Sequence, residues 1–148
     1  MKLTRSSRRR GFTLAELMVV VVILGLLATL VVKNVVPALF EAKHKIAKTE
    51  VMNIAEAVRS YQIKNGRLPE SLEPLVTPDE NGVTFLADRT EIPVDPWGFT
   101  YQYEADSNGM TFEVRSLGKD GEPGGEGDNA DISNKTIVNE RTAVDRGR

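Results

Sequence analysis

The stretch RRRGFTLAELMVVVVILGLLATLVV, residues 8–32, decides how this chain is organised. Three arginines precede Gly11, and the 21 residues from Phe12 to Val32 are apolar except for two threonines and one carboxylate, Glu16. As a helix, such a segment spans roughly 30 Å, the hydrocarbon thickness of a bilayer. No face of it is polar, which argues against a buried helix of a soluble protein. The segment is therefore predicted to cross a membrane, and Glu16 needs an explanation because a charged group in hydrocarbon is costly.

Charge is distributed unevenly along the 148 residues. Residues 1–11 hold five of the 19 basic residues and no acid, which leaves 14 basic against 21 acidic residues, a formal charge of −7. A domain this acidic argues against nucleic-acid binding. The basic start is typical of a topogenic signal that stays in the cytoplasm by the positive-inside rule. The chain has no cysteine, so no disulfide stabilises it.

Two ordinary membrane signals leave Glu16 unexplained. A plain signal anchor has no use for a carboxylate near its start. A secretory or twin-arginine signal, with a cleavage site at Val36-Pro37-Ala38, is disfavoured by length, since the apolar core of a signal peptide is usually about 7–15 residues.

The segment GFTLAE, residues 11–16, resembles the processing signal of the type IV pilin and pseudopilin superfamily. In that superfamily a membrane-embedded prepilin peptidase cuts after a glycine on the cytoplasmic side. The new amino-terminal phenylalanine is N-methylated, and the fifth mature residue is a glutamate. The resemblance implies cleavage between Gly11 and Phe12, N-methylation of Phe12, and an assembly role for Glu16. Pairing Glu16 with the Phe12 amine of a neighbouring subunit would remove part of the cost of the carboxylate and fix the axial offset between subunits.

An amphipathic pattern replaces the apolar run after Lys33. Apolar residues at helical spacing predict one buried face, formed by Ala47, Val51, Ile54, Val58 and Tyr61. Asn65-Gly66 predicts the end of the helix, because glycine readily takes the left-handed cap conformation. We expect one helix over about residues 13–64, with its first half in the membrane and its second half packed on a head domain. His44, the only histidine, lies among lysines and is expected on the solvated surface, without a transition-metal site.

Two runs of alternating apolar and polar residues predict an antiparallel hairpin. They are Phe99–Glu104 and Met110–Ser116, and they flank the turn sequence ADSNG. We therefore expect an α+β fold, in which a long amino-terminal helix packs on a small antiparallel sheet, with Trp97 at a corner of the core.

The sequence SLGKDGEPGGEGDNADI, residues 116–132, is a glycine-rich loop with five acidic residues. Its composition allows two interpretations, a solvated flexible loop or a calcium site. Calcium takes about six to eight oxygens, which carboxylates and inward-turned carbonyls of a glycine-rich backbone provide. The spacing does not match an EF-hand.

The loop, the DPWG sequence at residues 95–98 and the processing signal together resemble the major pseudopilins of type II secretion systems, over residues 8–132. Members of that family hold calcium in this loop, where other pilins often have a disulfide. The resemblance implies calcium ligands from the side chains of Asp120, Asp128 and Asp131 and the carbonyl of Leu117. The choice among Asp128, Asn129 and Asp131 stays open.

The resemblance implies a structural protein, the major subunit of a homopolymeric helical pseudopilus that pushes folded proteins across the outer membrane. The implied partners are further copies of the chain, minor pseudopilins, the prepilin peptidase and the inner-membrane assembly platform. The chain would cross the bacterial inner membrane once, with its carboxy-terminal head in the periplasm. Two alternatives are a type IV pilin for adhesion or motility, and a membrane-anchored calcium-binding module that does not polymerise. The sequence shows no catalytic constellation or Walker-type phosphate loop, so we expect no enzyme.

These expectations divide the chain into five segments. Residues 1–11 are a cleaved basic leader, 12–33 the transmembrane and assembly half-helix, 34–66 the amphipathic helix, and 67–132 the head with the hairpin and calcium loop. Residues 133–148 form a tail that departs from the family, whose members usually end soon after the loop. We expect the tail to be either a disordered extension or an additional subunit contact.

Overall fold

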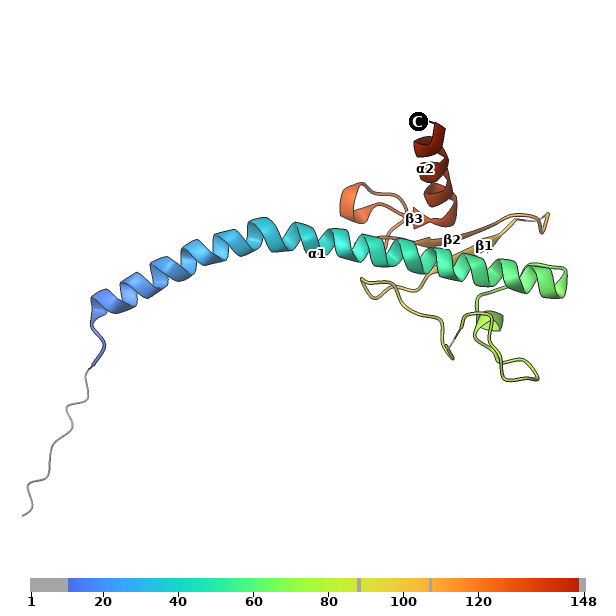
Figure 1. Ribbon diagram of the computed structural model, residues 1–148, viewed down its shortest axis with the longest axis horizontal. Coiled ribbons are helices and arrows are strands. Elements are labelled where there is room, and N and C mark those ends of the chain that lie inside the picture. The colour runs from blue at the N-terminus through green and yellow to red at the C-terminus, as the bar shows by residue number, and fades with distance from the viewer. Residues whose placement is uncertain (1–10, 88, 107, 147–148) are drawn as a thin grey trace, which may run out of the picture. The chain divides into compact units, whose positions relative to one another are not determined.

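The computed structural model describes residues 11–87, 89–106 and 108–146, so the predicted leader lies outside the described residues apart from Gly11. The chain divides into two compact units, Met1–Leu39 and Phe40–Arg148, and the helix α1 contributes to both. Figure 1 labels the helices and strands. Their order is α1 (Leu14–Asn65), the 3-10 helix η1 (Glu73–Leu75), β1 (Gln102–Ala105), β2 (Phe112–Ser116), the 3-10 helix η2 (Gly127–Asn129), β3 (Ile132–Ser133) and α2 (Asn134–Arg146).

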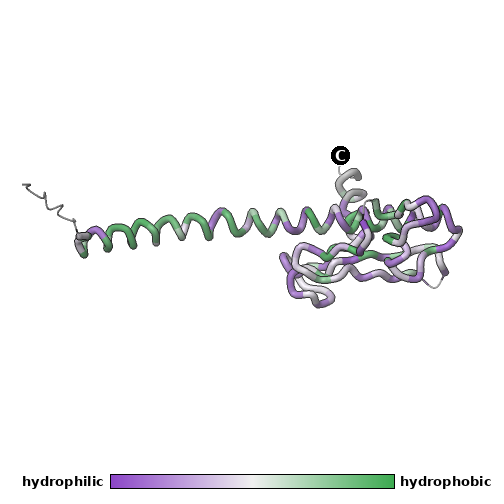
Figure 2. Tube along the Cα trace, turned by 90° about the horizontal axis from the view of Figure 1, so that it is seen from below, coloured by the Kyte–Doolittle hydropathy of each residue, from purple (hydrophilic) through white to green (hydrophobic). Residues whose placement is uncertain are grey.

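The described part of the first unit consists of the start of α1 and the three residues before it. Every side chain from Phe12 to Leu39 is exposed, and Figure 2 shows nearly continuous apolar colour along this part of the helix. An 18-residue window of α1 reaches a mean hydropathy of 2.8, and none of that window is buried in the chain itself. By length and composition, the helix is apolar enough to cross a membrane, as the sequence predicts.

The second half of α1 supplies one face of the core of the second unit. The predicted stripe is buried at Ala47, Val51, Ile54 and Val58, and Tyr61 packs partly buried against the same core. The helix ends at Asn65, and the N–H of Gly66 donates to the carbonyl of Gln62 at 2.8 Å. Gly66 has a φ of 71°, the left-handed conformation expected of the residue that follows a helix.

A three-stranded antiparallel sheet, in the order β1-β2-β3, packs on this helical face. The predicted hairpin forms β1 and β2, with Tyr103 opposite Val114. Phe112, Val114 and Ser116 of the central strand are buried while Glu113 and Arg115 are half-buried, which is the alternation that predicted the strand. Trp97 packs partly buried against the core, as expected.

Residues 133–146 correct the prediction of a disordered extension, because they complete β3 and form α2. Ile132 and Ile137 are buried in the core and hold both elements in place. Asn134 is also buried; its Oδ1 accepts the N–H of Val114 at 2.9 Å, and its Nδ2 donates to the carbonyl of Phe112 at 3.4 Å. The side-chain amide thus continues the hydrogen bonding of β2 beyond the two residues of β3.

Candidate functional site

The predicted processing site lies directly before α1. Gly11, Phe12 and Thr13 have no regular secondary structure, and the helix begins at Leu14. Thr13 and Glu16 form a reciprocal capping box: the N–H of Thr13 donates to Oε2 of Glu16 at 2.8 Å, and the N–H of Glu16 donates to Oγ1 of Thr13 at 3.2 Å. The Thr13 hydroxyl also donates to Oε2 of Glu16, at 3.0 Å. Such a box satisfies backbone donors that the first turn of a helix leaves unpaired.

The capping box gives Glu16 a second role that the sequence analysis missed. The signal was present as Thr-x-x-Glu immediately before an apolar helix. Within a single chain, the Glu16 carboxylate is therefore partnered by Thr13, although it remains exposed to the surroundings of the helix.

The DPWG turn anchors the start of the acidic loop. Asp95 is only 3% exposed, and its Oδ1 accepts the N–H groups of Trp97 at 3.0 Å and Phe99 at 2.8 Å. Its Oδ2 accepts the hydroxyl of Ser116, the last residue of β2, at 2.6 Å. The Ser116 hydroxyl oxygen in turn accepts the N–H of Gly118 at 3.3 Å. Two sequence motifs that are 21 residues apart thus form one hydrogen-bonded unit.

The glycines of the acidic loop, residues 116–132, allow its two limbs, residues 117–120 and 128–131, to lie against each other. Gly118 and Gly125 have φ values of 70° and 81°, in the region that favours glycine. A Cβ atom on Gly118 would come within 2.9 Å of the backbone of Asn129, and one on Gly125 within 2.5 Å of its carbonyl oxygen. The N–H of Lys119 also donates to the carbonyl of Asp128 at 3.1 Å. A side chain at either glycine would therefore clash with Asn129.

The structure places the four predicted calcium ligands on these two limbs without bringing the carboxylates together. Leu117 is buried directly after β2, and Asp120 is exposed with its Oδ1 accepting the N–H of Glu122 at 3.2 Å. Asp128 and Asp131 are half-buried on the other limb. Among the residues that the structure describes, no three Asp, Glu, His or Cys side chains are close enough to hold a metal.

The donors available in this loop nevertheless suit calcium. One oxygen of Asp131, Oδ1, is buried and has no hydrogen-bond partner, and its other oxygen lies 3.9 Å from the guanidinium of Arg115. A buried carboxylate oxygen without a partner is costly, and a bound cation would offset that cost. The oxygen donors and the close approach of the two limbs fit a calcium ion, although Asp120 and Asp128 would have to approach Asp131.

His44 is not on the solvated surface, contrary to the expectation from its lysine neighbours. Its side chain is 23% exposed, its ring contacts Trp97 edge-on at 5.3 Å between centroids, and its Nε2 lies 3.9 Å from Oδ1 of Asp128. The acidic loop returns over this part of α1, and Lys119 lies over the ring of Phe40 at 4.7 Å. Helical periodicity could not predict this contact, because it is made by a loop distant in sequence.

Comparison with known proteins matches both candidate regions. The family described as "Type II secretion system (T2SS), protein G" matches residues 34–135, and the prokaryotic N-terminal methylation motif matches residues 6–32. The chain belongs to the type II secretion system protein G family. The methylation motif covers the predicted cleavage site and the whole apolar run, whereas α2 continues beyond the matched residues.

Several similar proteins carry the name "Type II secretion system core protein G". The one from Pseudomonas aeruginosa is 42% identical over 86% of this chain and 95% of its own length. The one from Vibrio cholerae is 39% identical over 88% of this chain and 94% of its own. A crystal structure of the major pseudopilin from the type 2 secretion system of enterohaemorrhagic Escherichia coli has a TM-score of 0.49 and 26% identity, over 65% of this chain and 89% of that one. The family assignment does not depend on that structure.

Proposed function

We propose that this chain is the major structural subunit of a type II secretion pseudopilus. The observation that carries the proposal is the apolar start of α1, which the chain leaves entirely exposed. It continues into a folded second unit, and the chain belongs to the protein G family. Apolar surface of this extent needs lipid around a single subunit, or the α1 helices of other copies within a filament. Its partners in this role are further copies, minor pseudopilins, the prepilin peptidase and the inner-membrane assembly platform.

Processing and assembly act on the same few residues. Cleavage after Gly11 creates an amine at Phe12, one residue before the Thr13–Glu16 capping box. In lipid, an ionised Glu16 without a partner costs about 2.5–3.5 kcal/mol or more, and its bonds to Thr13 reduce that cost. The Phe12 amine of a neighbouring copy supplies the opposite charge, so Glu16 stabilises one axial offset between subunits. The filament then pushes folded proteins outward, while the head lies in the periplasm and the leader in the cytoplasm.

Calcium is the proposed ligand of the acidic loop. Asp120, Asp128 and Asp131 with the carbonyl of Leu117 would hold the ion, and Asn129 is the alternative to a neighbouring aspartate. Bound calcium would supply a divalent charge that offsets the repulsion among the carboxylates. The support is the unpartnered Oδ1 of Asp131 and the close limbs of the loop.

Replacing Glu16 tests the proposed function. We expect Glu16→Val to insert into the membrane normally, because the substitution removes a polar group from an apolar helix. Filaments should be lost, because the Phe12 amine of the next copy has no partner. The measurement is the share of the full chain in sheared surface fibres relative to the membrane fraction, in bacteria that assemble the system.

Glu56→Val is the matched control, since Glu56 is an exposed glutamate on the same helix beyond the apolar part. It should form filaments like the unaltered chain. Normal filaments from Glu16→Val would contradict the pairing of Glu16. An unaltered chain that binds calcium but forms no filaments would instead support the membrane-anchored module that does not polymerise.

A further inference from the structure

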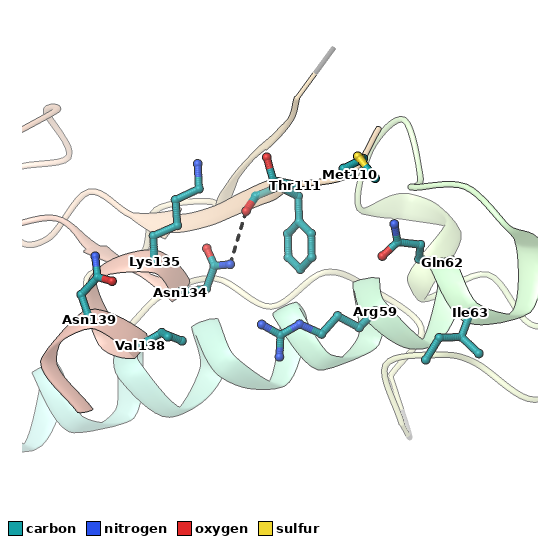
Figure 3. A pocket seen from close by; sticks show the side chains of 10 residues that line it. Arg59, Gln62, Ile63, Met110, Thr111, Asn134, Lys135, Val138 and Asn139 are labelled. Atoms are coloured by element: carbon teal, nitrogen blue, oxygen red, sulfur yellow. Dashed lines mark hydrogen bonds between the residues drawn. The ribbon is translucent and has the colours of Figure 1, made fainter. Parts of the chain in front are cut away.

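A groove of about 670 Å³ lies in the second unit, between the last turns of α1, the tip of the β1–β2 hairpin and the start of α2 (Figure 3). Its apolar lining includes Ile63 and Met110, whose side chains are 85% and 80% exposed. The wall formed by Val138 and Asn139 lies beyond residues 34–135, the part of the chain that matches the protein G family. The groove therefore includes part of α2 that lies beyond the family match.

The groove is basic, and one of its cations has no anionic partner among the described side chains. Arg59 and Lys135 are among the lining residues, and none of the lining residues is acidic. Lys135 lies 3.3 Å from Glu113 and keeps 53% of its side chain exposed. Arg59 is exposed and forms no ion pair with any side chain that the structure describes. Figure 3 shows its side chain reaching from α1 toward Val138 of α2. The groove thus suits a segment that carries carboxylates beside a small apolar group.

The chain itself carries a segment of this kind at the other end of the second unit. In the acidic loop, Glu122 and Glu126 are exposed on either side of Pro123, and neither forms an ion pair with another described residue. The base of this loop contacts Phe40 and His44. About 22 Å of helix separates His44 from Arg59 at 1.5 Å per residue. Within one copy, the base of the acidic loop and the basic groove are therefore well separated along α1.

We propose that the groove binds the acidic turn of residues 122–126 from a second copy of this chain in the filament. Glu122 and Glu126 would meet Arg59 and Lys135, and Pro123 would cover part of the apolar lining. The two surfaces differ, so the contact is heterologous, and each new copy brings one free groove and one free turn. A heterologous contact that does not close on itself propagates as an open helical filament. The inference rests on the proposed function, since it names a contact within the proposed pseudopilus.

Cysteine cross-linking tests the contact directly, because the unaltered chain has no cysteine. A full chain with both Gln62→Cys and Pro123→Cys should give a ladder of disulfide-linked multimers in filaments, since each copy then carries both sides of the contact. Two single variants produced together, Gln62→Cys and Pro123→Cys, should give a dimer and no ladder. The control pair of Gln62→Cys and Glu80→Cys uses another exposed head residue and should give no ladder.

Charge reversal provides a second test in the same cells. Arg59→Glu should cause loss of filaments, and adding Glu122→Arg and Glu126→Arg to it should restore them. Arg59→Lys should assemble normally, because it keeps the charge. Normal filaments from Arg59→Glu, or a ladder from the control pair as strong as that from the test pair, would overturn the contact. If Arg59→Glu formed normal filaments that were lost on adding Glu16→Val, the proposed function would stand without the contact. Failure of the unaltered chain to form filaments would overturn the proposed function itself.

Discussion

Two partners compete for the carboxylate of Glu16. Within one chain, the N–H and hydroxyl of Thr13 hold it in a capping box, and in the proposed filament the Phe12 amine of another copy takes it. The sequence predicted the second partner through a family resemblance and missed the first, although Thr-x-x-Glu is a readable signal.

We expect Gly11 to be required by the processing enzyme and not by the fold. A Cβ atom at this position would meet no atom within 4 Å, and its backbone is outside the left-handed region. We therefore expect Gly11→Ala to fold and insert normally but to be cleaved poorly, and Gly11→Leu to accumulate as precursor, since the peptidase must accommodate the side chain. Mass spectrometry of the unaltered chain should show an N-methylated Phe12 at the amino terminus. A mature chain that begins at Leu39 would instead establish cleavage as a signal peptide.

Asp79 gives the second unit a defined loss of stability in acid. The hydrogen bond from Lys64, together with those from the N–H groups of Val83 and Asn81, lowers the pKa of Asp79 from 3.8 to about 2. Because the folded pKa is the lower one, this contribution is complete above pH 3.8 and is lost as the pH falls toward about 2. Thermal unfolding across this range should show a shallower acid loss in Asp79→Asn than in the unaltered unit. If the difference in melting temperature between Asp79→Asn and the unaltered unit were the same below pH 5 as above it, this role would be contradicted.

At the scale of elements, the sequence predicted the helices and strands whose hydrophobic pattern repeats over several residues. The apolar stripe of α1 and the alternation in β1 and β2 recur over several turns or residue pairs, so their type could be predicted. β3 has two residues, too few to show any period, and its pairing depends on residues far away in the chain. The start of α2 depends on buried Asn134, whose hydrogen bonds to β2 no local pattern predicts. The prediction that His44 lies on the solvated surface was wrong for the same reason, because a loop distant in sequence covers it.

Asn134 should contribute more to stability than its place at the start of a surface helix suggests. Asn134→Ala removes both hydrogen bonds to β2 and leaves the N–H of buried Val114 without a partner. We expect a loss of about 1–3 kcal/mol in the free energy of unfolding, measured by urea denaturation of residues 40–148, which form a compact unit. Asn139→Ala is the control, an exposed asparagine on the same helix. Equal changes in both variants would contradict a specific contribution of the two Asn134 hydrogen bonds.

At the scale of the whole molecule, the two units have opposite requirements. The described part of the first unit is a mostly apolar helix that the chain leaves exposed, so we expect it to depend on lipid or on other copies, whereas the second unit has its own core. The proposed cleavage, methylation and Glu16 pairing involve the first unit, while the acidic loop and the groove belong to the second. Packing within one chain accounts for the core of the second unit. It does not account for the exposed apolar helix, or for Arg59 and the Asp131 oxygen, which have no partner among the described residues. These are the features for which we propose a membrane, a second copy and an ion.

Calcium should stabilise the second unit through the acidic loop. Among the described residues, Oδ1 of Asp131 is buried without a partner, and the glycines make the loop costly to order. The melting temperature of residues 40–148 should therefore be lower in chelator than in calcium. The gain corresponds to about 2.7 kcal/mol when calcium is a hundredfold above its dissociation constant. Magnesium should not replace calcium, because it resists a crowded shell of protein oxygens.

Two variants of the loop separate a specific site from general screening of its charge. Asp120→Ala should lose the calcium-dependent rise in melting temperature, because it removes a predicted ligand. Glu122→Ala removes a nearby exposed carboxylate outside the predicted ligand set, and it should keep the rise. If both variants responded like the unaltered unit, Asp120 would not be a ligand. If the unaltered unit melted at the same temperature in calcium and in chelator, the loop would be a solvated acidic segment, and Gly118 and Gly125 would serve only the close packing against Asn129.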